Sequence, residues 1–149
     1  MKQLDCPDES IWNQRRAWFE AQFDVDARGG GYIIGEQALG LLIDLQATFC
    51  AGAWNAVIVL ATAIIDSHLR EAELPEEFRG GMKAAFKNLH CRDELEWLRL
   101  RRNQLVHFAP EHGPAITVDA QWSNQDEFEK DARRAVALVS VVLFANPWT

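Results

Sequence analysis

Hydrophobic residues recur at helical spacing along most of the chain. Between positions 9 and 23 they lie three, four and one residues apart, and positions 8–10 hold residue types that cap helix N-termini. A second helix is predicted from Glu36 to about Phe49 on the same periodicity. Three consecutive glycines at 29–31 separate the two and predict a flexible connection.

The segment 54–69 is apolar on nearly every side. Asn55, Asp66 and His68 are its main polar interruptions, so the pattern predicts a helix that is buried on most of its surface. The β-branched residues at 57–59 would also suit a strand, but the length of the segment favours a helix. Gly52, just before it, either interrupts a helix or marks a tight turn.

The remaining sequence predicts further helices joined by loops. A proline at position 75 before two glutamates is typical of a helix start, and 82–89 is expected to be a short helical piece. Asp93 is expected to cap the next helix, which Pro110 closes. Residues 115–118 alternate in hydrophobicity, which predicts a short extended segment. Ser123 or Asn124 is expected to cap a last helix from 125 to about 144.

These elements predict an all-α fold in one domain covering residues 1–149. We expect a helical bundle of about four long helices plus short ones. Residues 1–35 would form an N-terminal helix and a glycine-rich linker, and residues 36–146 the core of the bundle.

Composition places the chain among ordinary globular proteins and limits its partners. It has 149 residues, of which 48% are hydrophobic, and a net charge of −7. That charge argues against a protein that coats nucleic acid or anionic membranes, because such a protein would have a basic surface. Locally the balance differs, because arginines stand at positions 92, 99, 101 and 102.

The three cysteines and the apolar tracts bear on location. Cys6, Cys50 and Cys91 are odd in number and lack any paired spacing, which favours reduced thiols in a cytoplasmic protein over disulfides or a zinc site. The first 23 residues lack the apolar core of a signal peptide. The longest apolar tract, 51–65, is shorter than the roughly 20 residues that span a bilayer, so no membrane association is expected.

The run 98–107, LRLRRNQLVH, holds the most informative residues. Asn103 and His107 are four apart and share a helix face, with Arg99 one turn earlier. Arg102 is five positions before His107, which is about 140° away around an ideal helix. Both side chains can reach one atom only if the helix end is distorted or a second copy of the chain contributes.

At these residues the chain resembles the HEPN superfamily, whose mark is an arginine, four to six residues, and a histidine. Arg102, Asn103 and His107 fit that form with four intervening residues. Upstream, residues 51–60, AGAWNAVIVL, look like the family's A-G-A-aromatic-x-A helix leading to an acid, here Asp66 where the family more often has glutamate. The resemblance covers about residues 36–144 and includes the order of the helices.

The resemblance implies cleavage of RNA without a metal or cofactor. A histidine can act as general base toward a ribose 2′-hydroxyl or as general acid toward the leaving oxygen, which would be the role of His107. Arg102 would bind the phosphate through its fork of donors, and Asn103 would orient either group. Asp66 would hold the arginine or histidine in place from the neighbouring helix.

The resemblance also implies a homodimer in which two sites face each other. Arg99 and Arg101 from both copies would then line a basic cleft for RNA on an otherwise acidic protein. A place in a toxin or phage-defence system is also expected, with an antitoxin-like protein as partner.

Other functions are also compatible with the sequence. Residue by residue, Arg102 could instead pair with Asp66 or Glu96 to pin two helices, and His107 could favour a helix C-terminus. The chain could be a non-catalytic HEPN-like domain that binds a nucleotide, RNA or a protein. It could also be a dimeric interaction module in which the motif is structural.

Overall fold

A computed structural model gives the fold of the chain and describes residues 5–73, 91–107, 111, 113, 115–145. The helical elements are α1 (Glu9–Gln22), α2 (Glu36–Ala51), α3 (Trp54–His68), the π-helical turn η1 (Leu69–Glu73), α5 (Arg92–Val106), α6 (Val118–Ser123) and α7 (Gln125–Leu143). No strand of a β-sheet occurs in these residues. The all-α bundle predicted from the sequence is therefore confirmed. The helical segments expected at 75–89 lie outside the described residues.

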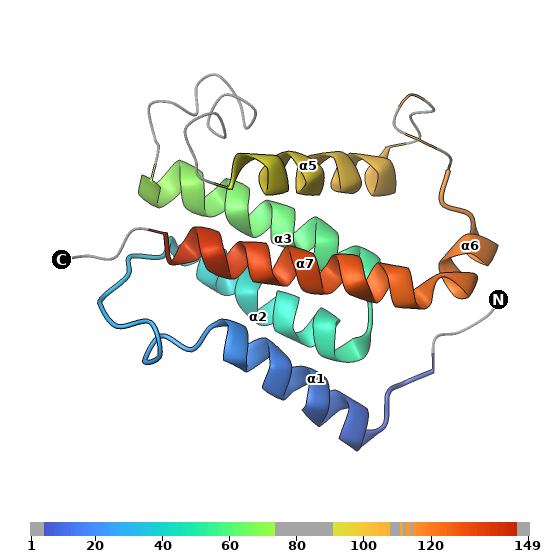
Figure 1. Cartoon of the computed structure of the whole chain (residues 1–149), viewed down its shortest axis with the longest axis horizontal. Helices are drawn as coiled ribbons and strands as arrows, with labels where there is room; N and C mark the ends of the chain where they lie inside the picture. Colours follow the sequence, from blue (N-terminus) through green and yellow to red (C-terminus); the bar gives the residue numbers. More distant parts are fainter. Residues whose placement is uncertain (1–4, 74–90, 108–110, 112, 114, 146–149) are drawn as a thin grey trace.

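Helix α3 is the central element of the bundle. It packs against α2, α5 and α7, and α1 covers α2 and α7 from the other side (Figure 1). Val57, Ile58, Ala61 and Ile64 of α3 are completely buried. The nearly uniform apolar character of this segment is thus explained by neighbours on three sides. Its remaining face, with Ala56 and Ala63 exposed, looks outward beside α5.

Helix α1 belongs to the same core. Its N-terminus is capped as expected, because the Asp8 side chain accepts from the backbone N–H of Ile11 at 2.8 Å. Phe19 is 3% exposed and contacts the ring of Phe49 on α2, with centroids 5.8 Å apart. The N-terminal helix therefore contributes core side chains directly.

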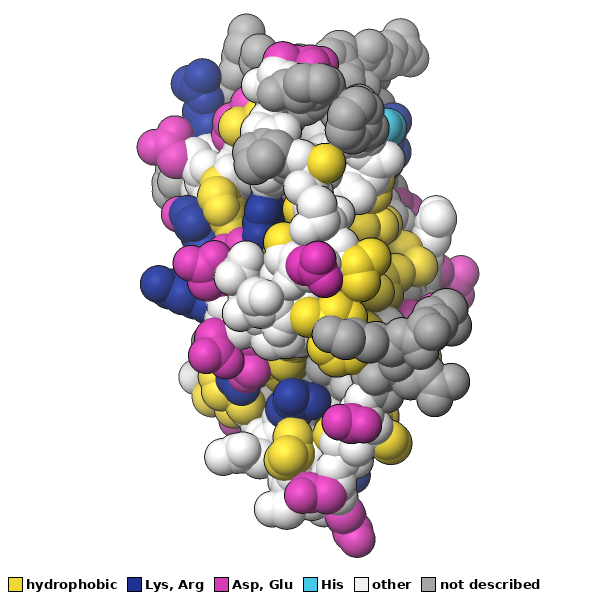
Figure 2. Space-filling model, turned by 90° about the vertical axis from the view of Figure 1, so that its right-hand side faces the viewer, with side chains coloured by type: hydrophobic (Ala, Val, Ile, Leu, Met, Phe, Trp, Pro, Cys, Tyr) yellow, Lys and Arg dark blue, Asp and Glu magenta, His cyan; other side chains and the backbone are white. Residues whose placement is uncertain are grey.

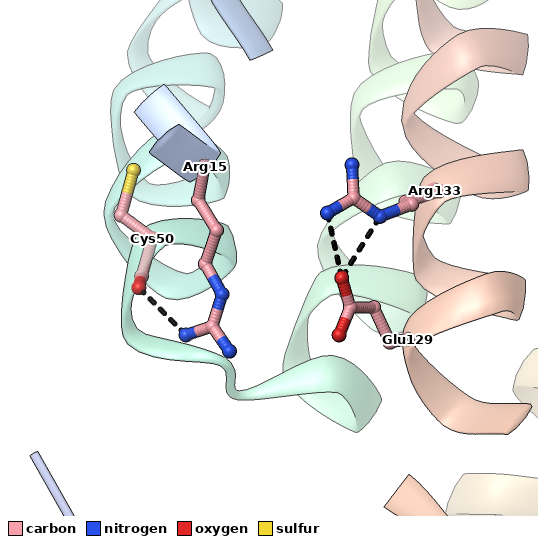
Figure 3. Close-up of polar contacts among 4 residues, drawn as sticks. All are labelled: Arg15, Cys50, Glu129 and Arg133. Carbon is pink, nitrogen blue, oxygen red and sulfur yellow. Dashed lines mark hydrogen bonds and ion pairs between the residues drawn. The ribbon is translucent and has the colours of Figure 1, made fainter. Parts of the chain in front are cut away.

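Gly52 makes a tight turn between α2 and α3. Its φ of 77° is left-handed, its N–H bonds to Phe49 O, and the next N–H bonds to Thr48 O, which is a Schellman ending. Nη1 of Arg15 donates to Cys50 O at 3.1 Å (Figure 3). The same guanidinium lies over the Trp54 ring, 4.7 Å from its centroid. The Ala-Gly-Ala-Trp string thus has a structural role, because it builds this corner against α1.

Both ends of α2 are completed by residues from other elements. At its C-terminal end the partner is Arg15 of α1. At its N-terminal end the N-cap position Gly35 has no side chain to offer, and Oε1 of Glu71 in η1 accepts from Glu36 N at 3.2 Å. A Cβ on Gly35 would collide with the Glu71 side chain, so glycine permits this approach.

One local prediction was wrong, and a second was correct only in part. Asp93 does not cap α5, because the N-cap position is Cys91 and Asp93 lies in the first turn, where its charge favours the helix dipole. Within the segment 115–118, Thr117 has the expected extended backbone, with φ −80° and ψ 160°, but Val118 does not. Thr117 caps α6 by accepting from Ala120 N at 3.1 Å, and Val118 begins that helix. The last helix does start at Gln125, with Asn124 at the N-cap position but without a side-chain capping bond.

Candidate active site

The site lies where α5 ends. Val106 is the last helical residue, and His107 turns into extended backbone with φ −122° and ψ 129°. This change brings Nε2 of His107 to 3.3 Å from Nη1 of Arg102. The distorted helix end, one of the two routes to convergence, is therefore the one found within a single chain. His107 is exposed to solvent.

Arg102 is free of carboxylates over the described part of the chain. Its Nη1 also lies 3.1 Å from Oδ1 of Asn103, so the three motif residues form one connected group. The suggested ion pairs with Asp66 or Glu96 are not formed, because these acids bind Arg70 and Arg99. A guanidinium without a carboxylate partner keeps donors available for a phosphate.

The contact between Arg102 and His107 has a defined polarity. A guanidinium has only donors, so a hydrogen bond between the two requires Nε2 to accept through its lone pair. Such a bond needs the tautomer whose N–H is at Nδ1. A phosphate that drew the guanidinium away would leave the Nε2 lone pair open to take a proton.

Asp66 is not placed to hold either motif residue. Its Oδ2 accepts from Nε of Arg70 at 3.0 Å, one turn further along. Its Oδ1 is buried and makes no hydrogen bond within the described residues. The expected support of Arg102 or His107 by Asp66 is therefore absent from the contacts, and the carboxylate instead positions Arg70.

A groove between α3, η1 and α5 is lined by Asp66, Arg102 and Asn103, among other residues. Its volume is about 330 Å³. The side chains that line it are Val59, Thr62, Ala63, Asp66, Arg70, Arg99, Arg102 and Asn103. Three arginines against one aspartate make it cationic, although the whole chain carries a net charge of −7. Arg70 was not anticipated; its position four residues after Asp66 was the available signal.

The other two arginines of the motif helix have separate surroundings. Arg99 lines the groove while its Nε and Nη2 bind Glu96 at 2.8 and 2.7 Å, and this hydrogen bonding raises the pKa of its guanidinium. Arg101 points toward α7, where Nε lies 2.8 Å from Asp131 and the guanidinium covers the Phe128 ring. It is not among the described residues of the groove, so its expected contact with RNA does not fit this placement.

The described residues hold neither a metal-binding cluster nor a membrane-spanning helix. They contain no cluster of three or more histidine, cysteine or acidic side chains that could hold a metal ion. None of the helices in the described ranges is both long and apolar enough to cross a bilayer. All three cysteines are free thiols.

Comparison with protein-family models, with curated proteins and with solved structures finds no match to this chain. The geometry of the groove and of the Arg102–His107 pair therefore carries the functional argument.

Proposed function

We propose that this chain is a metal-independent endoribonuclease of the HEPN type that acts as a homodimer. The observation that carries the proposal is the contact between Arg102 Nη1 and His107 Nε2 at 3.3 Å, with the histidine exposed and the arginine without a carboxylate partner in the described residues. Arg102 is thereby available for a phosphate and His107 for a proton.

The proposed reaction is an internal transfer at phosphorus. The ribose 2′-oxygen forms a bond to the adjacent phosphorus as its proton leaves, and the bond from phosphorus to the 5′-oxygen breaks as that oxygen gains a proton. The products are a 2′,3′-cyclic phosphate and a 5′-hydroxyl. Arg102 stabilises the charge that develops on the phosphate, and His107 moves a proton. Asn103 holds the Arg102 side chain from the same helix.

A second copy of the chain would complete this chemistry. One imidazole cannot take a proton from the 2′-hydroxyl and deliver another to the leaving oxygen at the same moment, whereas two imidazoles can. Two cationic grooves would also meet, which would attract RNA to an acidic protein. We place this dimer in the cytoplasm, in a toxin or phage-defence role with an antitoxin-like partner.

The alternative is a HEPN-like domain that binds RNA, a nucleotide or a protein without cleaving. The engagement of Arg99 by Glu96 and the presence of Asp66 in the groove favour it, because both reduce the charge available to a transition state. Binding without cleavage by the wild-type protein would establish this alternative.

The test is incubation of purified protein with labelled RNA, with and without EDTA. Arg102→Ala and His107→Ala are compared with Arg16→Ala, an exposed arginine on α1 that pairs with Glu20. We expect cleavage that survives EDTA, produces cyclic phosphate ends, and is lost in both site variants but not in the control. Equal decay of RNA in all samples would reveal a contaminating nuclease and refute the proposal.

A further inference from the structure

A second hollow lies nearer the start of α3 than the groove does. Its volume is about 560 Å³, within the range of about 300–1,000 Å³ typical of small-molecule sites. The side chains that line it are Asn55, Ala56, Val59, Leu60, Leu105, Ile116 and Gln121. Figure 2 looks onto the end of the bundle where α5 ends, and apolar side chains gather near the middle of this face. We name this hollow the apolar cleft.

The apolar cleft and the cationic groove are neighbouring hollows that share one wall residue. Val59 lines both hollows. On the α5 side, Leu105 of the cleft lies between Arg102 and His107 in the sequence. A strand whose phosphate lay at Arg102 would therefore have the apolar cleft beside it.

Two amide side chains supply the polar groups of the cleft. Oδ1 of Asn55 is buried and has no hydrogen-bond partner among the described residues, although Asn55 itself borders the cleft. A buried acceptor without a donor costs free energy, and a ligand with an N–H group would recover it if the Asn55 amide turned toward the cleft. Gln121 offers a second amide at the other wall. Amides carry both donors and acceptors, as the edges of nucleobases do.

We propose that the apolar cleft binds the nucleobase next to the phosphate held by Arg102. Aliphatic walls cover the faces of the base, and the amides of Asn55 and Gln121 bond to its edge. This inference rests on the proposed function, because it assigns a base to the same RNA strand. It adds that the protein distinguishes bases at one position instead of binding only the backbone.

The test measures binding without cleavage. Labelled 2′-deoxy hexanucleotides lack the attacking hydroxyl, and a hexamer of abasic units has the same phosphates without bases. Fluorescence anisotropy gives Kd for both with wild type, with Ala56→Leu to fill the cleft, and with Asn55→Leu to remove its amide. Ala47→Leu, at an exposed alanine on α2, is the matched control.

We expect Ala56→Leu to weaken binding of the intact hexamer about ten-fold, toward that of the abasic one, and to leave the abasic Kd unchanged. Asn55→Leu should narrow the differences among hexamers of the four bases. Thermal denaturation identifies any variant that fails to fold. The Asn55 variant should fold normally because its amide oxygen has no partner to lose.

Three results would overturn the inference. One is equal weakening of both oligomers by Ala56→Leu, and another is no measurable binding by wild type. The third is a change of sedimentation coefficient in Ala56→Leu with no change in RNA binding, which would assign the cleft to a second chain. None of these readouts depends on cleavage, so loss of the nuclease proposal and loss of the base site are distinguishable.

Discussion

Nη1 of Arg102 lies 3.3 Å from Nε2 of His107, although a continued α-helix would point the two side chains about 140° apart. The extended backbone at His107 removes that separation. A single chain thus brings together the two groups to which we assign phosphate binding and proton transfer, and the second chain of the proposed dimer would supply a second histidine.

Arg102→Lys tests whether the guanidinium fork matters beyond its charge. Lysine keeps the positive charge but is a single point donor, so we expect kcat to fall about 100-fold while KM for RNA changes little. Cleavage of a labelled RNA at saturating concentration gives kcat. Wild-type kcat in the lysine variant would show that charge alone is sufficient.

Asp66→Asn separates positioning from electrostatics. Because Asp66 contacts Arg70 and neither motif residue, we expect kcat to stay within about two-fold of wild type. Loss of the Asp66 carboxylate makes the groove more cationic, so KM should fall, most clearly at low salt. A ten-fold loss of kcat would instead show that Asp66 helps to position Arg102 or His107.

Gly52→Ala should destabilise the fold by about 1–2 kcal/mol, because φ is 77° at this position. The added Cβ would also stand 2.9 Å from Nη1 of Arg15, which can move aside. Gly40→Ala in the exposed middle of α2 is the contrasting control, since its Cβ meets no atom within 4 Å. It should stabilise by up to about 1 kcal/mol. Urea denaturation measures the change in the free energy of unfolding of each variant. Equal changes in Gly52→Ala and Gly40→Ala would contradict the left-handed turn at Gly52.

The ion pair between Glu94 and Arg134 predicts a pH dependence. Nε and Nη2 of Arg134 donate to the two carboxylate oxygens of Glu94 at 2.7 Å, and this bonding lowers the pKa of Glu94. A depressed folded-state pKa contributes stability above the ordinary carboxyl range, and that contribution disappears as pH falls through the folded value. Glu94→Gln should therefore lower the free energy of unfolding by less than about 1 kcal/mol at pH 7, because the pair is half exposed. At pH 3 the loss should be smaller still.

Urea midpoints at both pH values, with Asp26→Asn in the loop after α1 as control, give the comparison. If the urea midpoints of wild type and Glu94→Gln differed more at pH 3 than at pH 7, the expected direction of the pH dependence would be wrong.

The three thiols should react in a fixed order with a disulfide reagent at pH 8. Cys6 is exposed and should react at once, while burial raises the pKa values of Cys91 and Cys50 and slows both. Cys50 is 1% exposed and should react only on unfolding. Cys6→Ser should abolish the fast phase, and a fast phase that persists would contradict the order.

The long helices could be predicted from sequence because their periodicity is local. The starts at Glu36 and Gln125 agree with the structure, and the burial of α3 follows from its composition. The short α6 was missed because alternating residues over four positions fit a strand equally well. The placement of Asp93 failed for a similar reason, since acids suit both the cap and the first turn.

The site was predictable only in part. The spacing of Arg102 and His107 identified the residues, but their contact depends on where α5 ends. The partners of the charged groups could not be read from spacing. Arg101 turns to Asp131, thirty positions away, and the choice between α7 and the groove is made by packing around Phe128.

The completion of α2 by Arg15 and Glu71 has a consequence for how the chain folds. The C-terminal end of α2 closes locally at Gly52, but its N-terminal end has no cap of its own, and the added contacts from Arg15 and Glu71 span thirty-five residues each. The N-terminal end of α2 is therefore completed only after η1 has docked, and the contact at Cys50 forms only after α1 has docked. We expect α1, α2 and α3 to gain hydrogen-exchange protection as one cooperative unit, so a fragment lacking the first 35 residues would lose protection in α2 as well.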